Sequence, residues 1–589
     1  MRKLAKNFSF ILLFASGVAI AAIKFVPNQQ PYGYIAPPTL SKVNISGGDA
    51  VTFVPWFERE SFRGDLIAGA TSATGVVNLA TPLWRAGTVL DAQDWDLGRK
   101  IFTMHKDGYA VPFRALSLDN DQMKELENDE NERLDFLRGD RSNEGGLFGR
   151  VRDSVLGDII HSNPYYVGVP RAGYAGDGYP AFAYTHRNRP GMVYVGANDG
   201  MLHAFDATTG EEKWAYIPSM LFNDAKLGLL AEDPYVHQYY VDGPITVEDA
   251  QKADGTWYTV LVGGLGAGGR GLFALDVTSA ATPTTEADAA TKLMWELSDQ
   301  DSGNINYTYA RTSIVKLNDG KWYAVTGNGY MGGSKAFLLI INLETGVITR
   351  EIELDGGGDN GLSSPTLVDI NKDGTADYAY AGDLNGNMWK IDLTSATPSL
   401  WGPAFDNDDK IPLFTTAEDP VTGDFQPITT APEIGLHPDN GLMVYFATGR
   451  LFATEDAQGD EGASVQSVYG IRDNNWDPLN LPIPQTALLN QDLRRGTHAD
   501  SGTAVRTATN HSINWTTHKG WRTDLQVDSP TTEEIGERVL QDVILKDGRV
   551  QFMSTNPTFA TGSNWLMQLN ASNGGAPGAP VIDLSGDRK

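Results

Sequence analysis

A short pattern of strands and tight turns repeats along this chain and limits the folds open to it. The clearest copy joins Val193-Tyr-Val-Gly196 through the turn Asn198-Asp-Gly200 to Leu202-His-Ala-Phe-Asp206, and it closes at Thr209-Gly210 before Lys213-Trp214. Asn-Gly and Asp-Gly pairs suit two-residue hairpins, because both central residues of such a turn need positive φ. The flanking apolar runs have the length and composition of strands. The unit therefore predicts an antiparallel meander.

Variants of this unit recur downstream, with leading strands at residues 260–263, 323–327, 378–382, 443–449 and 550–554. Repeated four-stranded units are typical of a β-propeller, because one blade cannot bury both of its faces alone. The unit resembles blades of the quinoprotein-like class. We therefore expect a mainly β protein, a modified β-propeller with six counted blades. Residues 474–530 leave room for a seventh, irregular blade.

The beginning of the chain predicts export. Residues 1–22 combine a basic start with an apolar run of signal-peptide length, and the basic residues are Arg2, Lys3 and Lys6. We therefore expect the chain to be exported. The chain has no cysteine, so it folds without disulfides and without thiol catalysis.

The segment before the propeller has a different character. Residues 23–50 are rich in Pro, Tyr and Gln and are expected to form a linker. Residues 51–155 are expected to form a small mixed α/β segment packed on the propeller. Within it, Asp119 to Leu137 predicts two short helices with acidic first turns. Residues 156–589 then form the propeller.

The stretch 369–377 has the spacing of a calcium-binding loop. Oxygen-bearing side chains stand at its first, third, fifth and ninth positions, which are Asp369, Asn371, Asp373 and Asp377. The carbonyl of Thr375 is the fifth expected ligand, and Gly374 permits the sharp turn. The flanks read as strands, and Tyr380 replaces the usual bidentate Glu, so the prediction is a Ca²⁺ loop in a β-hairpin rather than an EF-hand. The alternative is an acidic surface turn without an ion.

Charge and motifs exclude several other functions. A formal net charge of −28 disfavours nucleic acid and anionic lipid as partners. The pattern Gly264-x-Gly266-x-x-Gly269 continues as a strand, so it predicts a hairpin turn rather than a dinucleotide site. His203 lies within a blade strand and is expected to be packed rather than catalytic. We find no active centre and expect no small-molecule substrate.

Two Arg-Gly-Asp triplets occur, at residues 63–65 and 138–140. Such triplets can bind integrin-type receptors, but a three-residue match is weak. The interpretation favoured here is that these residues form buried or helix-capping ion pairs.

Taken together, several segments make the chain resemble the C-terminal propeller region of the PilY-type type IV pilus biogenesis factors. The segments are residues 138–144, 155–159, 164–168, 198–206, 263–269, 327–329 and the calcium loop. The resemblance implies a propeller with one calcium ion on its rim, held by Asp369, Asn371, Asp373, Thr375 and Asp377. It also implies a non-enzymatic role in pilus extension, surface adhesion and twitching motility. The implied location is the periplasm or outer membrane, the cell surface or a pilus tip of a Gram-negative bacterium. The implied partners are minor pilins or other pilus components, and host or abiotic surfaces.

Departures from the family pattern leave alternatives open. Many members carry a large N-terminal von Willebrand A-like region with a D-x-S-x-S motif, and this chain has neither, so it is expected to be a short form. One alternative function is a periplasmic scaffold for outer-membrane assembly. The other is a quinoprotein dehydrogenase, which the lack of cysteine and the rim position of the loop disfavour.

Overall fold

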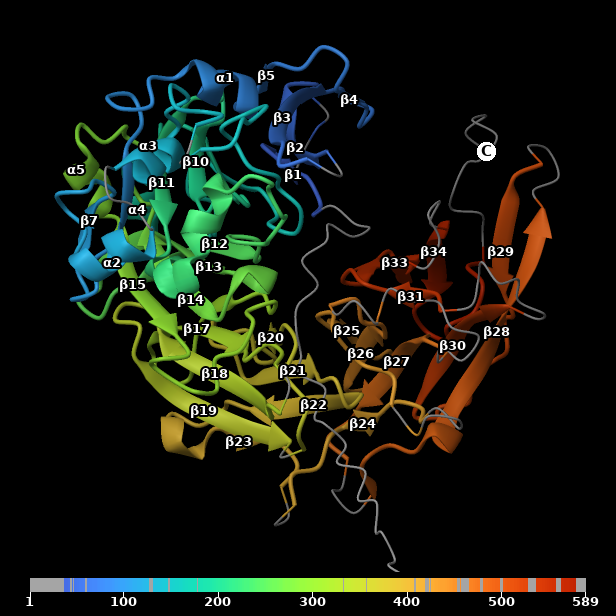
Figure 1. Ribbon diagram of the computed structural model, residues 1–589. Helices are drawn as coiled ribbons and strands as arrows, with labels where there is room; N and C mark the ends of the chain where they lie inside the picture. Colours follow the sequence, from blue (N-terminus) through green and yellow to red (C-terminus); the bar gives the residue numbers. More distant parts are fainter. Residues whose placement is uncertain are drawn as a thin grey trace, which may run out of the picture.

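The computed structural model describes residues 36–578, with gaps at 43–44, 46, 59–60, 127–130, 147–148, 177, 332, 356, 407–408, 419–422, 424, 453–455, 457–464, 477–479, 498–501, 528–535 and 558–562. The predicted signal peptide and residues 23–35 of the predicted linker lie outside the described residues. Seven β-sheets follow one another in chain order around an arc, from blue through green and yellow to red in Figure 1. The expectation of a mainly β, propeller-like protein is confirmed.

The first sheet comes from the segment before residue 90 and has five strands. They are β1 Thr39–Leu40, β2 Ala50–Phe57, β3 Gly64–Thr71, β4 Val77–Asn78 and β5 Trp84–Arg85. The next sheet is the first blade, with β8 Tyr165–Val167, β9 Met192–Gly196, β10 Leu202–Asp206 and β11 Glu212–Ile217. Two earlier strands, β6 Ile101–Met104 and β7 Ala110–Pro112, extend its outer edge, where β6 pairs in parallel with β11.

The second and third blades are four-stranded antiparallel meanders. The second contains β12 Ile245–Gln251, β13 Trp257–Gly264, β14 Gly271–Asp276 and β15 Leu293–Ser298. The third contains β16 Ser313–Lys316, β17 Trp322–Gly327, β18 Ala336–Asn342 and β19 Ile348–Asp355. The Gly-rich stretch between β13 and β14 is a hairpin connection that contains the 3₁₀ turn η2 Gly266–Gly268, so its reading as a turn is confirmed.

The last three blades are less regular. The fourth has β20 Thr366–Val368, β21 Tyr378–Gly382, β22 Asn387–Asp392, β23 Gly402–Pro403 and β24 Phe414–Thr415. The fifth has β25 Glu433–Leu436, β26 Leu442–Ala447, β27 Ser467–Asp473, β28 Leu488–Thr497, β29 Ala504–Ala508 and β30 Gly520–Val527. The sixth has β31 Arg538–Val539, β32 Ile544–Lys546, β33 Arg549–Asn556 and β34 Ser563–Asn570.

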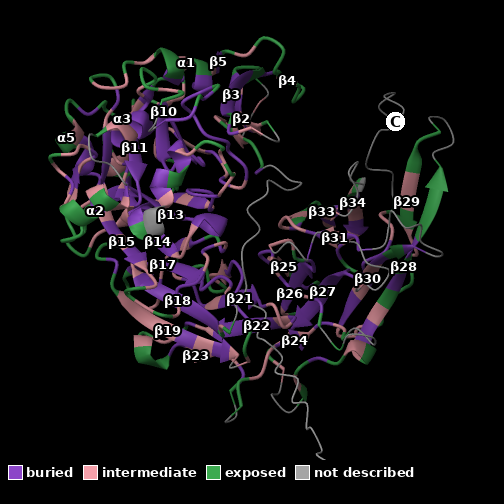
Figure 2. Cartoon of the chain, in the orientation of Figure 1, coloured by how far each residue is buried: buried purple, intermediate pink, exposed green. Residues whose placement is uncertain are grey.

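The count of six blades is confirmed, but the expected place of a seventh between residues 474 and 530 is wrong. The three strands in that stretch, β28, β29 and β30, join the fifth blade, where β30 takes the outer position beside β27. The seventh sheet is instead the N-terminal one. Strand β29 is short and lies largely at the surface, as Figure 2 shows. The sequence of such a strand does not indicate which sheet it joins, which explains the wrong prediction.

Alternation along the strands explains how the blades stack. In β18, Leu339 and Ile341 pack into one buried cluster together with residues of β13 in the second blade. Their neighbours Leu338 and Ile340 point the other way and pack against Ala379 of the fourth blade. Successive side chains of a strand face opposite sides of its sheet. A strand such as β18, whose blade is packed between two other blades, is therefore apolar on both faces. Figure 2 shows β18 as buried along most of its length.

Helices are few and short, and most lie in the segment before the propeller. They are α1 Ala86–Ala92, α2 Asn120–Glu125, α3 Glu132–Arg138, α4 Tyr179–Thr185 and α5 Glu286–Ala290, with the 3₁₀ segments η1 Ser219–Ala231, η3 Pro398–Leu400 and η6 Gln485–Ala487. The two helices predicted between Asp119 and Leu137 are confirmed as α2 and α3. Asp119 caps α2 in a capping box with Gln122. Among the described residues, none of the helices has the length and apolarity needed to cross a membrane.

Candidate metal centre

The predicted calcium loop connects the first two strands of the fourth blade. Strand β20 ends at Val368 and β21 begins at Tyr378, and these two residues pair across the hairpin. The Asp377 amide donates to the Val368 carbonyl at 2.8 Å and closes the base of the loop. Residues 369–377 therefore project from the end of an otherwise regular antiparallel pair.

The carboxylate of Asp369 organises the first half of the loop. Its Oδ1 accepts from the amides of Lys372 at 2.6 Å and Asp373 at 3.2 Å. Its Oδ2 accepts from the amide of Gly374 at 2.8 Å. Three backbone donors on one side chain wrap the chain around that carboxylate. The first expected ligand therefore lies at the centre of the turn.

The next two expected ligands form local turns of their own. Asn371 Oδ1 accepts from the Asp373 amide at 2.8 Å, and Asp373 Oδ1 accepts from the Thr375 amide at 2.9 Å. The Thr375 hydroxyl also lies 2.5 Å from Asp373 Oδ1. These donors, with the hydroxyl first, hold the pKa of Asp373 below its ordinary value. The carboxylate of Asp373 is therefore charged at neutral pH.

Asp377 brings the end of the loop back to its beginning. Its side chain is buried, and its Oδ2 accepts from the amide of Ile370 at 3.0 Å. Because Ile370 directly follows Asp369, this bond ties the last expected ligand to the backbone beside the first. The two ends of the loop are therefore held near each other, and the calcium site stays a prediction.

Two backbone positions make the tight curl possible. Lys372 has φ of 62° and Gly374 has φ of 91°. The left-handed region is disfavoured for residues with a Cβ. A Cβ built on Gly374 would have no neighbour within 4 Å, so glycine is needed there for conformation and not for space.

The donor chemistry of the loop fits a hard cation. All five expected ligands offer oxygen, and Ca²⁺ prefers a flexible shell of oxygens at this kind of loop. Carboxylates alone are not enough: over the described ranges, no three His, Asp or Glu side chains are gathered closely enough to hold a metal. The amide oxygen of Asn371 and the carbonyl of Thr375 would have to complete the shell. The residues present therefore fit calcium only if carboxylate, amide and backbone carbonyl oxygens bind it together.

Sequence reasoning missed a buried charged network in the first blade. Arg99 lies beside Glu212 with its Nε 2.7 Å from Oε2 and its Nη2 2.8 Å from Oε1. Glu212 Oε1 is 2.7 Å from His203 Nδ1, and the other ring nitrogen lies 3.1 Å from Asp199. Local sequence gives no signal for it, because Arg99 and Glu212 are 113 residues apart.

The network explains why His203 is structural. Burial opposes its charged form, but Asp199 and Glu212 outweigh burial and raise the pKa of His203 to about 9. Burial likewise opposes ionisation of Glu212, but Arg99 and His203 lower its pKa to about 2. His203 is fully buried, so the expectation of a packed histidine is confirmed.

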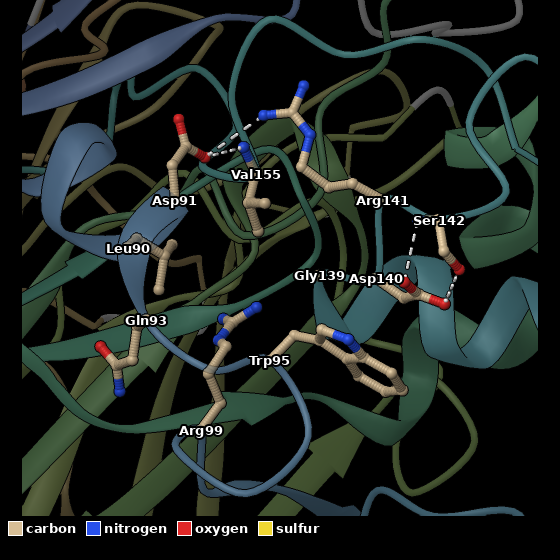
Figure 3. Close-up of a pocket in the computed structure, with 10 residues that line it drawn as sticks. All are labelled: Leu90, Asp91, Gln93, Trp95, Arg99, Gly139, Asp140, Arg141, Ser142 and Val155. Carbon is tan, nitrogen blue, oxygen red and sulfur yellow. Dashed lines mark hydrogen bonds and ion pairs between the residues drawn. The ribbon is translucent and has the colours of Figure 1, made fainter.

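Neither Arg-Gly-Asp triplet forms a displayed loop. Arg138 is fully buried, with its Nη1 2.8 Å from Glu286 Oε1, and Asp65 accepts from Arg85 at 3.0 Å. Residues 139–142 line a cavity of about 300 Å³. In Figure 3 the Asp140 carboxylate is turned toward Ser142. Asp140 Oδ1 accepts from the Ser142 amide at 2.9 Å. The predicted ion pairs are confirmed for both triplets.

These sheets and this loop define a β-propeller protein with an oxygen-rich connection on one blade. A family model described as the PilY1 beta-propeller domain matches residues 156–490. The chain belongs to that family.

Known relatives agree with this assignment. The type IV pilus biogenesis factor PilY1 of Pseudomonas aeruginosa strain PAK is 37% identical, over 89% of this chain and 48% of that protein. A PilY1 homolog of Xylella fastidiosa is also 37% identical, over 76% of this chain and 31% of that protein. The chain spans about half the length of the Pseudomonas relatives that it matches.

A solved structure shares the fold. The crystal structure of the Pseudomonas aeruginosa PilY1 C-terminal domain superimposes with a TM-score of 0.57 at 36% sequence identity. The match covers 69% of this chain and 86% of that structure.

Proposed function

We propose that this chain is a calcium-binding, non-enzymatic component of the type IV pilus machinery that supports pilus extension, adhesion and twitching motility. Membership of the PilY1 family supports the pilus context, since curated relatives are named as type IV pilus biogenesis factors. One observation carries the calcium part of the proposal. The loop 369–377 curls around the Asp369 carboxylate, is tied at its base by Asp377, and carries all five expected oxygen ligands.

The loop residues provide the mechanism. Asp369, Asp373 and Asp377 bring three negative charges to one short connection, and like charges at this spacing repel. A bound Ca²⁺ would offset the excess of negative charge, which Lys372 alone does not balance. With that charge in place, Asp369 and Asp377 hold the two ends of the loop together, so that the rim presents one ordered surface to its partner.

We further propose that the chain is exported, acts in the envelope or at the pilus tip, and contacts minor pilins or other pilus components. Host or abiotic surfaces would be contacted through the same assembly. A surface with net charge −28 suits cation-dependent contacts and repels nucleic acid.

Isothermal titration calorimetry tests the metal site. Wild type should take up one Ca²⁺, whereas Asp369→Ala and Asp377→Ala should abolish uptake. Asp254→Ala is the control, because Asp254 accepts from the Thr256 amide at 2.8 Å in the corresponding turn of the second blade, much as Asp373 does from Thr375. Unchanged calcium uptake in both loop variants would refute the site.

A deletion strain complemented with the same variants tests the cellular role. We expect loss of surface pili and twitching, with rescue by wild type and Asp254→Ala but not by Asp369→Ala. Normal twitching together with reduced outer-membrane porins would instead favour the periplasmic assembly scaffold.

A further inference from the structure

The calcium loop is attached to the blade before it as well as to its own. Leu317 and Ala376 form an isolated parallel bridge, and the Ala376 amide donates to the Lys316 carbonyl at 2.9 Å. Lys316 ends β16 and Leu317 begins the β16–β17 turn of the third blade. The second half of the loop therefore closes the seam between the third and fourth blades.

The side chain of Asn318 makes polar contacts across this seam next to the loop. Its Nδ2 donates to the carbonyls of Ala376 and Leu393, both at 3.1 Å. The same nitrogen lies 3.4 Å from Asp377 Oδ1, the last expected ligand. The two hydrogens of this amide go to the two carbonyls, so Asn318 holds the backbone directly before Asp377 and lies beside its carboxylate.

The other end of the Asn318 amide faces Thr375. The Thr375 hydroxyl lies 3.2 Å from Asn318 Oδ1 and 2.5 Å from Asp373 Oδ1. A hydroxyl has one hydrogen to donate. Thr375 can therefore satisfy Asp373 in its own loop or Asn318 in the neighbouring blade, but not both fully.

The turn that carries Asn318 does not itself need asparagine. The corresponding turn of the second blade has the same closing bonds: Gly255 donates to Lys252 at 3.0 Å, and Gly320 donates to Leu317 at 2.9 Å. The residue in the place of Asn318 there is Ala253. The asparagine is therefore placed for its contacts with the loop rather than for the geometry of the turn.

From these contacts we propose that Asn318 is a positioning residue for the calcium loop and couples metal occupancy to the seam between the third and fourth blades. The inference rests on the proposed calcium function. When Asp373 turns its oxygen to the metal, the Thr375 hydroxyl is released and donates to Asn318 Oδ1. Asn318 in turn holds Asp377 in its ligating position. Metal binding thereby strengthens the contact between two blades.

Calorimetry of Asn318→Ala is the first test. No expected ligand is removed, yet Ca²⁺ affinity should fall roughly 10-fold, the lower end of the range for residues that orient metal ligands. Asp254→Ala again serves as the control. Wild-type affinity in Asn318→Ala, with uptake still lost in Asp369→Ala, would overturn the positioning role and leave the site standing. Absence of uptake by the wild type would overturn both.

A double-mutant cycle tests the hydroxyl switch. Thr375→Val keeps the backbone carbonyl and removes only the hydroxyl. If Thr375 acts through Asn318, the double variant should lose little more affinity than Asn318→Ala alone. Additive losses would show that the two residues act separately and would overturn the switch.

Hydrogen exchange separates the proposed coupling from a purely structural role of Asn318. A purely structural asparagine would leave the effect of Ca²⁺ on amide exchange in the third blade unchanged. In the wild type, added Ca²⁺ should slow amide exchange in residues 316–321 of the third blade, which contribute none of the expected ligands. The slowing should disappear in Asn318→Ala under saturating Ca²⁺. Equal protection in both proteins would overturn the coupling between blades.

Discussion

Two acidic clusters in this protein are neutralised in opposite ways. In the first blade, Asp199 and Glu212 are buried and face Arg99 and His203, so four charges cancel inside the protein. In the loop of the fourth blade, the acceptors of Asp369 are filled by backbone amides, which carry no net charge. In the first blade the balancing cations are side chains of the protein. For the loop, our proposal is that the balancing cation comes from solution.

The largest effect should come from breaking the buried cluster. Glu212→Gln leaves Arg99 and His203 without their shared counter-charge, and removing one partner of a buried pair costs about 3–5 kcal/mol of unfolding free energy. Urea denaturation should show this loss equally with and without Ca²⁺. Glu211→Gln is the control, because Glu211 is half exposed and pairs with Lys213 at the surface. A loss no larger than that of the control would contradict the comparison.

The loop cluster should stabilise the protein only when its ion is present. At a free Ca²⁺ concentration 100 times the Kd, wild type should gain about 2.7 kcal/mol of unfolding free energy. Asp377→Ala should show no gain, whereas Glu212→Gln should keep the full gain from its lower starting point. A gain that is reduced in Glu212→Gln would mean that the two clusters are not independent.

The pH dependence of the buried cluster is of similar size. The folded-state pKa of His203 is raised to about 9 from 6.5, so its stabilising contribution is complete below pH 6.5 and is lost as pH rises through 9. The loss should be roughly 3 kcal/mol, since each unit of pKa shift is worth about 1.4 kcal/mol. His203→Gln should flatten the decline between pH 6 and pH 9.5. Identical pH profiles for the two proteins would contradict the assigned charge state.

The smallest effect concerns Lys316, which acts on the loop from the neighbouring blade. Lys316 helps to lower the pKa of Asp373, after the larger contributions of Thr375 and other hydrogen bonds. Its positive charge opposes an incoming cation, so Lys316→Gln should raise Ca²⁺ affinity about twofold at low salt, a surface effect below about 1 kcal/mol. The gain should vanish at high ionic strength. Lys321→Gln, which alters the same turn, should leave the affinity unchanged.

The sequence predicted the fold well because its signals are local. Alternating apolar strands such as β18 and turns such as Asn198-Asp-Gly200 repeat often enough to count six blades. The prediction failed for β28 to β30, because strand composition does not say which neighbour a strand joins. It also gave no indication that the N-terminal strands form a seventh sheet, since their pairing links residues without a repeated pattern.

The expected ligands show the same limit at a smaller scale. The curl of residues 369–377 could be predicted because it depends on residues close together in the chain, and the structure does tie the two ends of this loop together. The role of Asn318 could not be predicted, because it lies 57 residues from Thr375 along the chain. The triplet at Arg138 predicted an ion pair but did not identify Glu286 as its partner.

By itself, then, the sequence determined the period of the strands, the turns between them and the order of oxygens in one connection. These follow from the backbone geometry of residues close together in the chain. Only the tertiary structure decided which charges cancel and which blade supports the loop. Burial and pairing depend on residues brought together from distant positions, and that proximity exists only once the blades have stacked.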